Sequence, residues 1–292
     1  MGSLKARRIR KAITPFLLVA PAVILIGIFV YGVVNGVLQG FGVMPFLGRV
    51  EPTFDYYAQA FSQEGFLAGA GYSLYLASAS SLGALAGGIV LSALLTRLSA
   101  SRTLQLFGIQ IPLITAHVVV VLFVVSLFSG SGLLSRLLFS MGIITSVTAF
   151  PSVVGDPWGW GIILTYFWKE IPFVAFCTVT IMSHVSERFG EASLTLGASP
   201  VRTFFEVTLP LCKNALIKAF LVIFAFAFGS YEVPFLLGPT LPKALPVLAY
   251  MEFQNPDILN RSYAMAINGS MAFICCVLAV VYFIVLQRDK ER

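Results

Sequence analysis

Acidic and basic residues inside long apolar stretches are the first side chains in this sequence that could do chemistry. Glu232 lies in the segment Phe-Gly-Ser-Tyr-Glu-Val-Pro at positions 228–234. An ionisable group inside a membrane-spanning segment costs about 2.5 to 3.5 kcal/mol on insertion scales, so it usually faces a cavity or a partner. Gly229 and Pro234 would loosen a helix and free backbone carbonyls, as in the broken helices that line transport paths. We expect Tyr231 and Glu232 to line a route for a cationic or metal-bearing solute.

Two alternatives for Glu232 stay open, an ion pair with Lys169 and an outer-interface position that water simply wets. Lys169 and Glu170 stand side by side in another apolar stretch, next to Pro172. Adjacent residues point to different faces of a helix, so we do not expect these two to pair with each other. Either one could line the solute path, or meet the neighbourhood of Glu232 or a partner chain.

A polar segment, residues 184–213, separates two apolar stretches and holds a second candidate site. Gly197 would allow either a sharp turn or the close approach of a partner. Ser199 and Pro200 are typical of an N-cap and a first helical residue, and predict a short helix over Val201–Val207 that ends before Pro210. With a preceding helix around Glu191, the segment predicts a compact, projecting knob. The residues of interest are Glu191, Ala192, Ser193, Gly197, Ala198, Val207, Leu209 and Pro210.

The spacing of these residues resembles the EAA loop of ATP-binding-cassette (ABC) importer permeases. Here it is Glu-Ala-Ser, three residues, Gly, nine residues and Val-x-Leu-Pro, where the family usually has Glu-Ala-Ala and Ile-x-Leu-Pro. Ser193 for Ala and Val207 for Ile are the departures. The resemblance implies a six-helix, all-α membrane protein with the type I importer permease (MetI-like) fold. In that family the loop is a cytosolic coupling helix that docks on the ATPase, which assigns Glu191 and Gly197 the coupling role.

The resemblance also implies partners. We expect two ABC ATPase subunits that carry ATP and magnesium, a second permease subunit that is a different chain, and an extracytoplasmic solute-binding protein. The chain itself would hold no cofactor and no metal, and would not be an enzyme. The stretch from Tyr231 to Gly238 is similar to permeases of the polyamine and ferric iron group, which favours a spermidine or putrescine type of solute. Ferric iron, phosphonate, thiamine and sugar remain alternatives.

Composition indicates which elements must position these residues. Of the 292 residues, 58% are hydrophobic and 11% are charged, whereas a soluble domain carries about a quarter charged residues. A spanning helix needs about 20 apolar residues. The chain has six such runs, near residues 12–37, 67–95, 104–128, 159–182, 215–237 and 264–286.

Charge asymmetry predicts the topology. Lysine and arginine collect at the amino-terminal end, around Arg97 and Arg102, in the polar segment and in the tail to Arg292, and such clusters mark cytosolic loops. Residues 1–11 would then be a cytosolic basic tail and 12–292 a permease domain, with both termini cytosolic. We expect a multi-pass protein of the bacterial cytoplasmic (inner) membrane. The stretches 54–61 and 133–141 predict short interfacial helices.

Other function classes find less support. The cysteines and the two histidines have no metal-ligand spacing, and no GxxxxGK[ST] phosphate loop occurs in the sequence. The basic residues follow the ends of apolar runs, which favours the bilayer over nucleic acid as the partner. The rival from another class is a secondary transporter driven by an ion gradient, in which Glu232, Lys169 and Glu170 would relay protons or cations.

Overall fold

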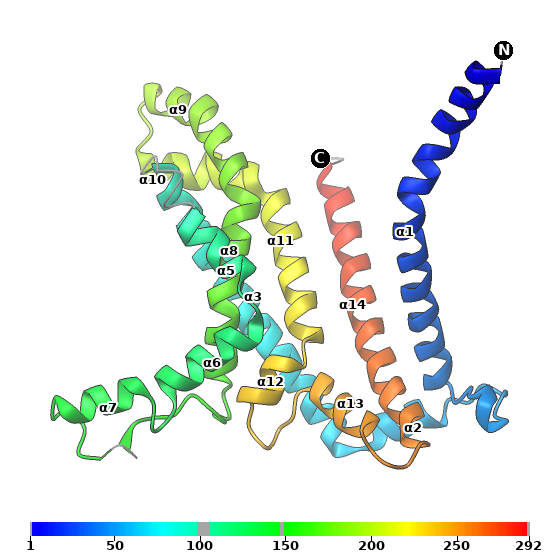
Figure 1. Cartoon of the computed structure of the whole chain (residues 1–292). Helices are drawn as coiled ribbons and strands as arrows, with labels where there is room; N and C mark the ends of the chain where they lie inside the picture. Colours follow the sequence, from blue (N-terminus) through cyan, green and yellow to red (C-terminus); the bar gives the residue numbers. More distant parts are fainter. Residues whose placement is uncertain (1, 98–105, 147–148, 291–292) are drawn as a thin grey trace. The chain divides into compact units, whose positions relative to one another are not determined.

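The computed structural model describes residues 2–97, 106–146 and 149–290, and in these ranges the chain is built from helices and connecting loops (Figure 1). Arg102 and Arg292, which the topology prediction used, lie outside the described residues. Six helical stretches are long and apolar enough to cross a membrane: Leu18–Gly40, Gly65–Thr96, His117–Ser140, Trp160–Gly190, Pro200–Gly229 and Asn260–Val280. The predicted number of spans and the all-α class are confirmed.

The chain divides into two compact units, which are described separately. The first comprises Met1–Ala60 and Glu252–Ser270, and the second Phe61–Met251 and Met271–Arg292. The first unit contains α1 (Gly2–Gly40), most of α2 (Asp55–Ser62) and the start of α14 (Asn260–Lys290). A Cβ on Gly40 would lie 3.2 Å from the Ala266 nitrogen, and one on Gly269 would meet the Tyr57 hydroxyl. Small residues therefore let these helices approach closely, as is common between membrane helices.

The second unit holds both candidate sites. Its elements in chain order are α3 (Glu64–Arg97), a π turn (Leu106–Gln110), α5 (Ile111–Ile114), α6 (His117–Phe128), α7 (Leu133–Ser140), α8 (Trp160–Val185), a π turn (Ser186–Gly190), α9 (Glu191–Thr195), α10 (Pro200–Thr203), a π turn (Phe204–Thr208), α11 (Leu209–Gly229), α12 (Glu232–Leu237), α13 (Leu245–Phe253) up to Met251, and the part of α14 that follows Ser270. Helix α7 confirms the predicted short helix near residues 133–141, and α2 in the first unit confirms that near 54–61.

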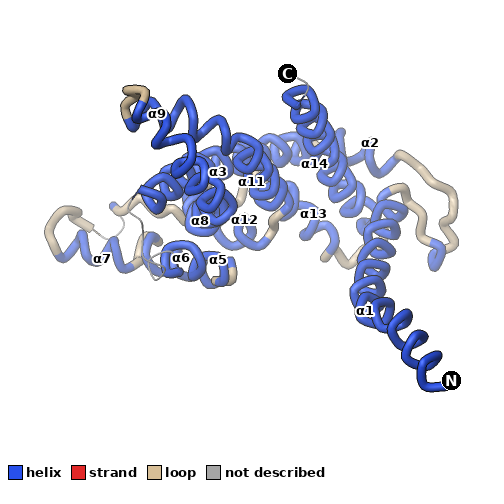
Figure 2. Tube along the Cα trace, turned by 90° about the horizontal axis from the view of Figure 1, so that it is seen from above, coloured by secondary structure: helices blue, strands red, loops and turns tan. Residues whose placement is uncertain are grey.

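Helix α8 is the centre of this unit. It packs against α3 and α11 on one side and against α6 on another, as the view from above shows (Figure 2). Gly83 and Gly87 of α3 lie directly against Phe167 and Ile171 of α8. Between one and two turns further along both helices, the Ser92 and Thr178 hydroxyls are 2.8 Å apart. Residue numbers rise together along the contact, so α3 and α8 run parallel.

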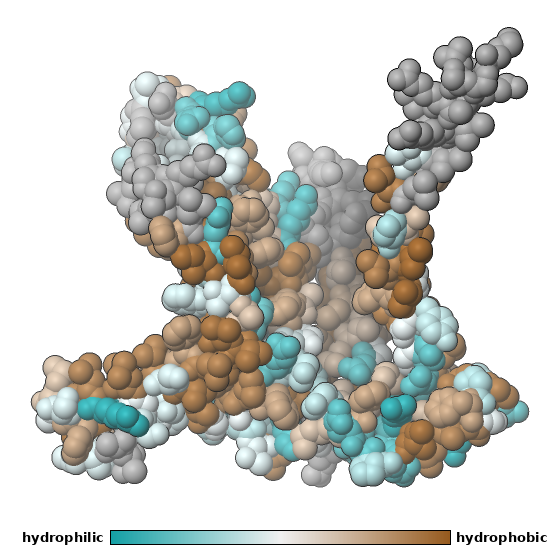
Figure 3. Space-filling view, viewed as in Figure 1, coloured by the Kyte–Doolittle hydropathy of each residue, from teal (hydrophilic) through white to brown (hydrophobic). Residues whose placement is uncertain are grey.

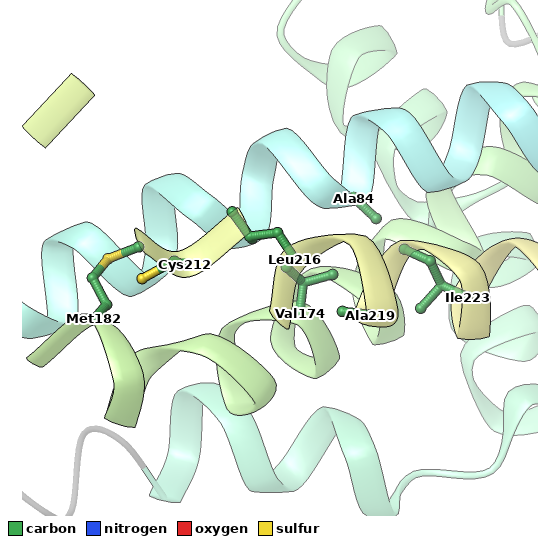
Figure 4. Close-up of a cluster of buried hydrophobic side chains, with 7 residues drawn as sticks. All are labelled: Ala84, Val174, Met182, Cys212, Leu216, Ala219 and Ile223. Carbon is green, nitrogen blue, oxygen red and sulfur yellow. The ribbon is translucent and has the colours of Figure 1, made fainter. Parts of the chain in front are cut away.

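An apolar cluster joins α3, α8 and α11 and is shown in Figure 4. Its buried members are Ala84, Val174, Met182, Cys212, Leu216, Ala219 and Ile223. Cys212 thus serves as a packing residue. The outer surface over α6 and the middle of α8 is mostly hydrophobic (Figure 3), as expected for a surface that faces lipid.

Two of the spans predicted from the sequence, residues 104–128 and 215–237, are interrupted in the structure. The fifth was expected to loosen near Gly229, and α11 does end there: Ser230 is extended (φ −74°, ψ 129°) and α12 begins at Glu232. The third span was predicted as one continuous helix, and this is wrong. Helix α5 ends at Ile114, Thr115 is extended (φ −64°, ψ 129°), and α6 starts at His117. Both breaks lie beside α8.

Candidate functional site

The polar segment forms a helical hairpin that is continuous with two membrane helices (Figure 1, α9 and α10). Helix α8 continues through the π turn Ser186–Gly190 into α9, and α10 continues through the π turn Phe204–Thr208 into α11. The predicted short helix does not end before Pro210. The π turn shifts the bonding register by one residue, and Pro210, which has no N–H, falls in the first turn of α11, where a missing donor costs little. A force on the hairpin would therefore act directly on α8 and α11.

Gly197 makes the corner of this hairpin. Its φ is +87°, in the left-handed region that favours glycine, and no heavy atom lies within 4 Å of where a Cβ would stand. The positive φ supports the sharp turn, and the close approach of a partner stays a prediction. Ser199 follows as the N-cap of α10, its side chain accepting a hydrogen bond from the Arg202 backbone N–H at 3.3 Å. Both sequence-based assignments are borne out.

Ser193, where the family pattern has alanine, holds the hairpin together. Its hydroxyl donates to the Gly190 carbonyl (3.0 Å) and lies 2.6 Å from the Thr203 hydroxyl on α10. Gly190 and Thr203 are buried. The substitution therefore adds a polar bridge between the two arms, which the sequence alone did not reveal because Thr203 is distant along the chain.

The tip of the hairpin presents apolar side chains to solvent. Leu196 is 88% exposed, and Val201 and Phe205 are 60% and 61% exposed. Arg202 and Glu206 form a two-pronged ion pair at 2.9–3.0 Å beside them. Apolar side chains that protrude at a polar tip are typical of a surface that binds another protein. Sequence reasoning missed Leu196, Val201 and Phe205, although their apolar type inside a polar segment was a usable signal.

The other predicted loop residues are placed around this tip. The backbone of Glu191 begins α9, and its side chain lies outside the described part of the chain. Ala192 is exposed and Ala198 half-buried. The last three predicted residues lie where the hairpin joins α11. Val207 is half-buried, Leu209 packs on the apolar cluster and Pro210 is exposed. No group of three metal-ligating side chains occurs among the described residues.

The break in the fifth span carries the second set of predicted residues. Glu232 is the first residue of α12 and its side chain is exposed. The ring of Tyr231 stacks on Tyr250 of α13, with centroids 4.9 Å apart and planes at 21°. Phe235 meets Tyr250 edge-on at 5.7 Å. Glu232 thus follows directly, along the chain, a residue of this small aromatic group, and aromatic faces attract ammonium ions.

The Lys169 side chain points to the break in the third span and not to the break in the fifth. Its ammonium donates to the Thr115 carbonyl at 2.6 Å and lies 3.5 Å from His117 Nδ1. The His117 ring stacks on Phe226 of α11 at 4.8 Å. Within the described residues Lys169 forms an ion pair neither with Glu232 nor with Glu170. The suggested Lys169–Glu232 pair is therefore wrong, because the freed carbonyl of Thr115 offers the ammonium a nearer partner.

Glu170 is buried, with 4% of its surface exposed. The sequence brought Lys169, Glu170, Tyr231 and Glu232 together as one group, but the structure divides them. Tyr231 and Glu232 lie at the fifth-span break, Lys169 at the third-span break, and Glu170 inside the helix packing.

Comparison with known proteins adds an independent line of evidence. Residues 79–289 match the family model described as "Binding-protein-dependent transport system inner membrane component". A putrescine transport system permease protein, PotI of Escherichia coli, is 24% identical over 250 residues, which is 81% of this chain and 79% of that protein. A molybdate/tungstate transport system permease protein of Methanocaldococcus jannaschii is 40% identical over 96 residues, or 32% of this chain.

The chain spans between 38% and 54% of the length of three of the curated relatives it matches. Among solved structures, a chain of a bacterial ABC transporter involved in the import of the acidic polysaccharide alginate has a TM-score of 0.73 at 20% identity. The alignment covers 96% of this chain and 99% of that one. At 20% identity this similarity shows a shared fold.

Proposed function

The chain belongs to the family of inner membrane components of binding-protein-dependent transport systems, and from this premise we propose that it couples an ATPase to an amine-conducting path. It is the permease type of subunit, a multi-pass inner membrane protein. The observation that carries the coupling proposal is the α9–α10 hairpin, which extends α8 and α11 without a flexible link. Leu196, Val201 and Phe205 offer the apolar contact, and the coupling role of Glu191 stays a proposal that comes from the resemblance of the loop.

The topology follows from this role. Six crossings put both ends of the chain on one side of the membrane, and the basic residues near the hairpin favour the cytosol for it. An ATPase can reach the hairpin only there. A cysteine introduced at Leu196 should react with a membrane-impermeant maleimide in inside-out vesicles and stay unreactive in intact cells, and labelling from outside would contradict the coupling role.

The expected partners complete the importer. We propose two ATPase subunits that bind ATP and magnesium, a solute-binding protein outside, and a second permease that is a different chain. Another subunit or lipid would cover the first span, Leu18–Gly40, because its most apolar stretch is not buried within this chain. ATP binding would draw the docked hairpins together and rock the permease halves between inward-open and outward-open states.

For the solute we propose a cationic amine of the spermidine or putrescine type. Support comes from the exposed Glu232 at the start of α12 and from the stacked Tyr231 and Tyr250 rings at the same break, because carboxylates and aromatic faces both attract ammonium groups. The similarity to a putrescine permease over 81% of the chain points the same way.

A second candidate solute is an oxyanion. Lys169 and His117 place donors at the other break, and ammonium groups bind oxyanions readily. The relative with 40% identity over 96 residues is a molybdate/tungstate permease. The amine is preferred because Glu232 is exposed, whereas the Lys169 ammonium already donates to a backbone carbonyl.

Uptake by the reconstituted complex separates these candidates. Proteoliposomes that contain the permease, its co-purifying subunits and the binding protein would be offered labelled putrescine and labelled molybdate. We expect ATP-dependent putrescine uptake that falls at least tenfold in Glu232→Gln, with Glu252→Gln as a control. Molybdate uptake would select the second candidate. Uptake by the isolated chain under a proton gradient would contradict both and favour the secondary transporter.

A further inference from the structure

Three buried polar side chains at the centre of the second unit make no hydrogen bond of good geometry with the described residues, although the Tyr166 hydroxyl lies toward Ser230. They are Ser81 on α3 and Tyr166 and Glu170 on α8. In Glu170, both carboxyl oxygens lack such a hydrogen bond. Tyr166 and Ser81 are fully buried and Glu170 is 4% exposed. Buried polar atoms in native proteins usually have partners, so three together call for an explanation.

The helix geometry brings these residues to one level. Tyr166, Glu170 and Val174 follow one another at intervals of four along α8, so they share a face. The Tyr166 ring packs edge-on against Phe226 of α11 at 6.5 Å, and Val174 belongs to the apolar cluster with Ile223 of the same helix. Glu170 therefore lies between these two contacts, on the side of α8 that faces α11.

Helix α3 completes the surroundings. Ala84 belongs to the same apolar cluster (Figure 4), and Ser81 is one turn before it. Because α3 and α8 run parallel, Ser81 and Tyr166 both lie on the side of the cluster that faces the fifth-span break after Phe226. The polar trio thus caps the cluster at the level of that break.

A lone carboxylate cannot stay ionised in such a place. Burying a charge without a partner costs far more than burying a neutral group, and the group takes up a proton or a cation instead. The charged neighbours do not supply one. Lys169 points to Thr115, His117 stacks on Phe226, and the facing parts of α3 and α11 contain no charged residue. Because the chain itself encloses 96% of Glu170, another protein chain cannot reach it either.

We propose that Glu170, Tyr166 and Ser81 form an intramembrane cation site, which holds a proton while α3, α8 and α11 are packed together and the ammonium group of the solute when the fifth span moves away. The second half rests on the proposed amine transport. When the break at Ser230 separates α11 from α8, Glu170 meets the path, gives its proton to water and binds the amine as a carboxylate.

Carbodiimide labelling tests the proton half without any transport. Dicyclohexylcarbodiimide reacts with protonated carboxyl groups in apolar surroundings. The complete complex in nanodiscs, treated at neutral pH and analysed by mass spectrometry, should carry the label on Glu170 and not on the exposed Glu232. Glu170→Gln should remove that label, and Glu232→Gln should leave it in place. Absence of label at Glu170 overturns the proposal.

The amine half is tested on the same complex. Putrescine at saturating concentration, with ATP and the binding protein, should slow Glu170 labelling at least fivefold, and sodium at the same ionic strength should not. Unchanged labelling while putrescine is transported overturns the amine half. If putrescine is not transported, the proposed solute fails, while labelling of Glu170 still supports the proton site. Thermal unfolding controls for structure, because Glu170→Gln removes a buried acid and should not lower the Tm.

Discussion

Gly197 offers the most quantitative test of the coupling hairpin. Its φ of +87° lies in the left-handed region, and no atom lies within 4 Å of an added Cβ. A substitution there is therefore opposed by the backbone conformation alone and not by a clash. The left-handed conformation costs an L-residue roughly 1 to 2 kcal/mol relative to the right-handed one. Asparagine tolerates it better than alanine, and a β-branched residue tolerates it worst.

These costs predict a graded loss of ATPase binding. If the hairpin must adopt its native corner to dock, 1 to 2 kcal/mol lowers the competent population by up to about 5- to 30-fold, and the apparent Kd rises by the same factor. We expect the affinity order Gly197, then Gly197→Asn, Gly197→Ala and Gly197→Val. The control Gly142→Ala changes a positive-φ glycine (φ +72°) after α7, outside the hairpin.

Binding of the purified ATPase subunit to the permease in nanodiscs measures this order. Membrane insertion and expression should be equal across the series, because the corner lies outside the spans. Equal affinity for the valine and glycine forms would refute the reasoning, since the left-handed corner would then not matter for docking. An asparagine form weaker than the valine form would refute it as well, because it would point to size rather than backbone conformation.

Three further predictions follow from the same structure. Ser193→Ala and Thr203→Val should each lower the amount of solute transported per ATP about two- to tenfold, because each removes the same hydrogen bond, worth about 0.5 to 1.5 kcal/mol. The double variant should be no worse than the stronger single variant, and additive losses would contradict a shared bond. Leu196→Asp should weaken ATPase binding at least tenfold in a pull-down, since it puts a charge into an apolar contact; Leu133→Asp, at an exposed leucine outside the hairpin, is the control. Lys169→Met should lower the Tm of the permease by several degrees, because the Thr115 carbonyl loses its donor; an unchanged Tm would contradict the bond.

The sequence by itself determined the class of protein and the outline of its coupling loop. Apolar run length is a local property, so six spans could be counted before any packing was known. The corner at Gly197 and the cap at Ser199 were predictable for the same reason, because φ preference and N-cap chemistry depend on a few consecutive residues. The loosening of the fifth span near Gly229 was read from the same kind of signal.

Only the tertiary structure decided which residues meet. Ser193 and Thr203 become partners because the hairpin folds back on itself, and Lys169 finds Thr115 because the third span breaks beside α8. Glu170, adjacent to Lys169 in sequence, is buried at 4% exposure because α3 and α11 close over its side of the helix. The physical reason is common to all three: a local pattern fixes the direction of each side chain on its own helix, but its surroundings come from helices that are distant along the chain.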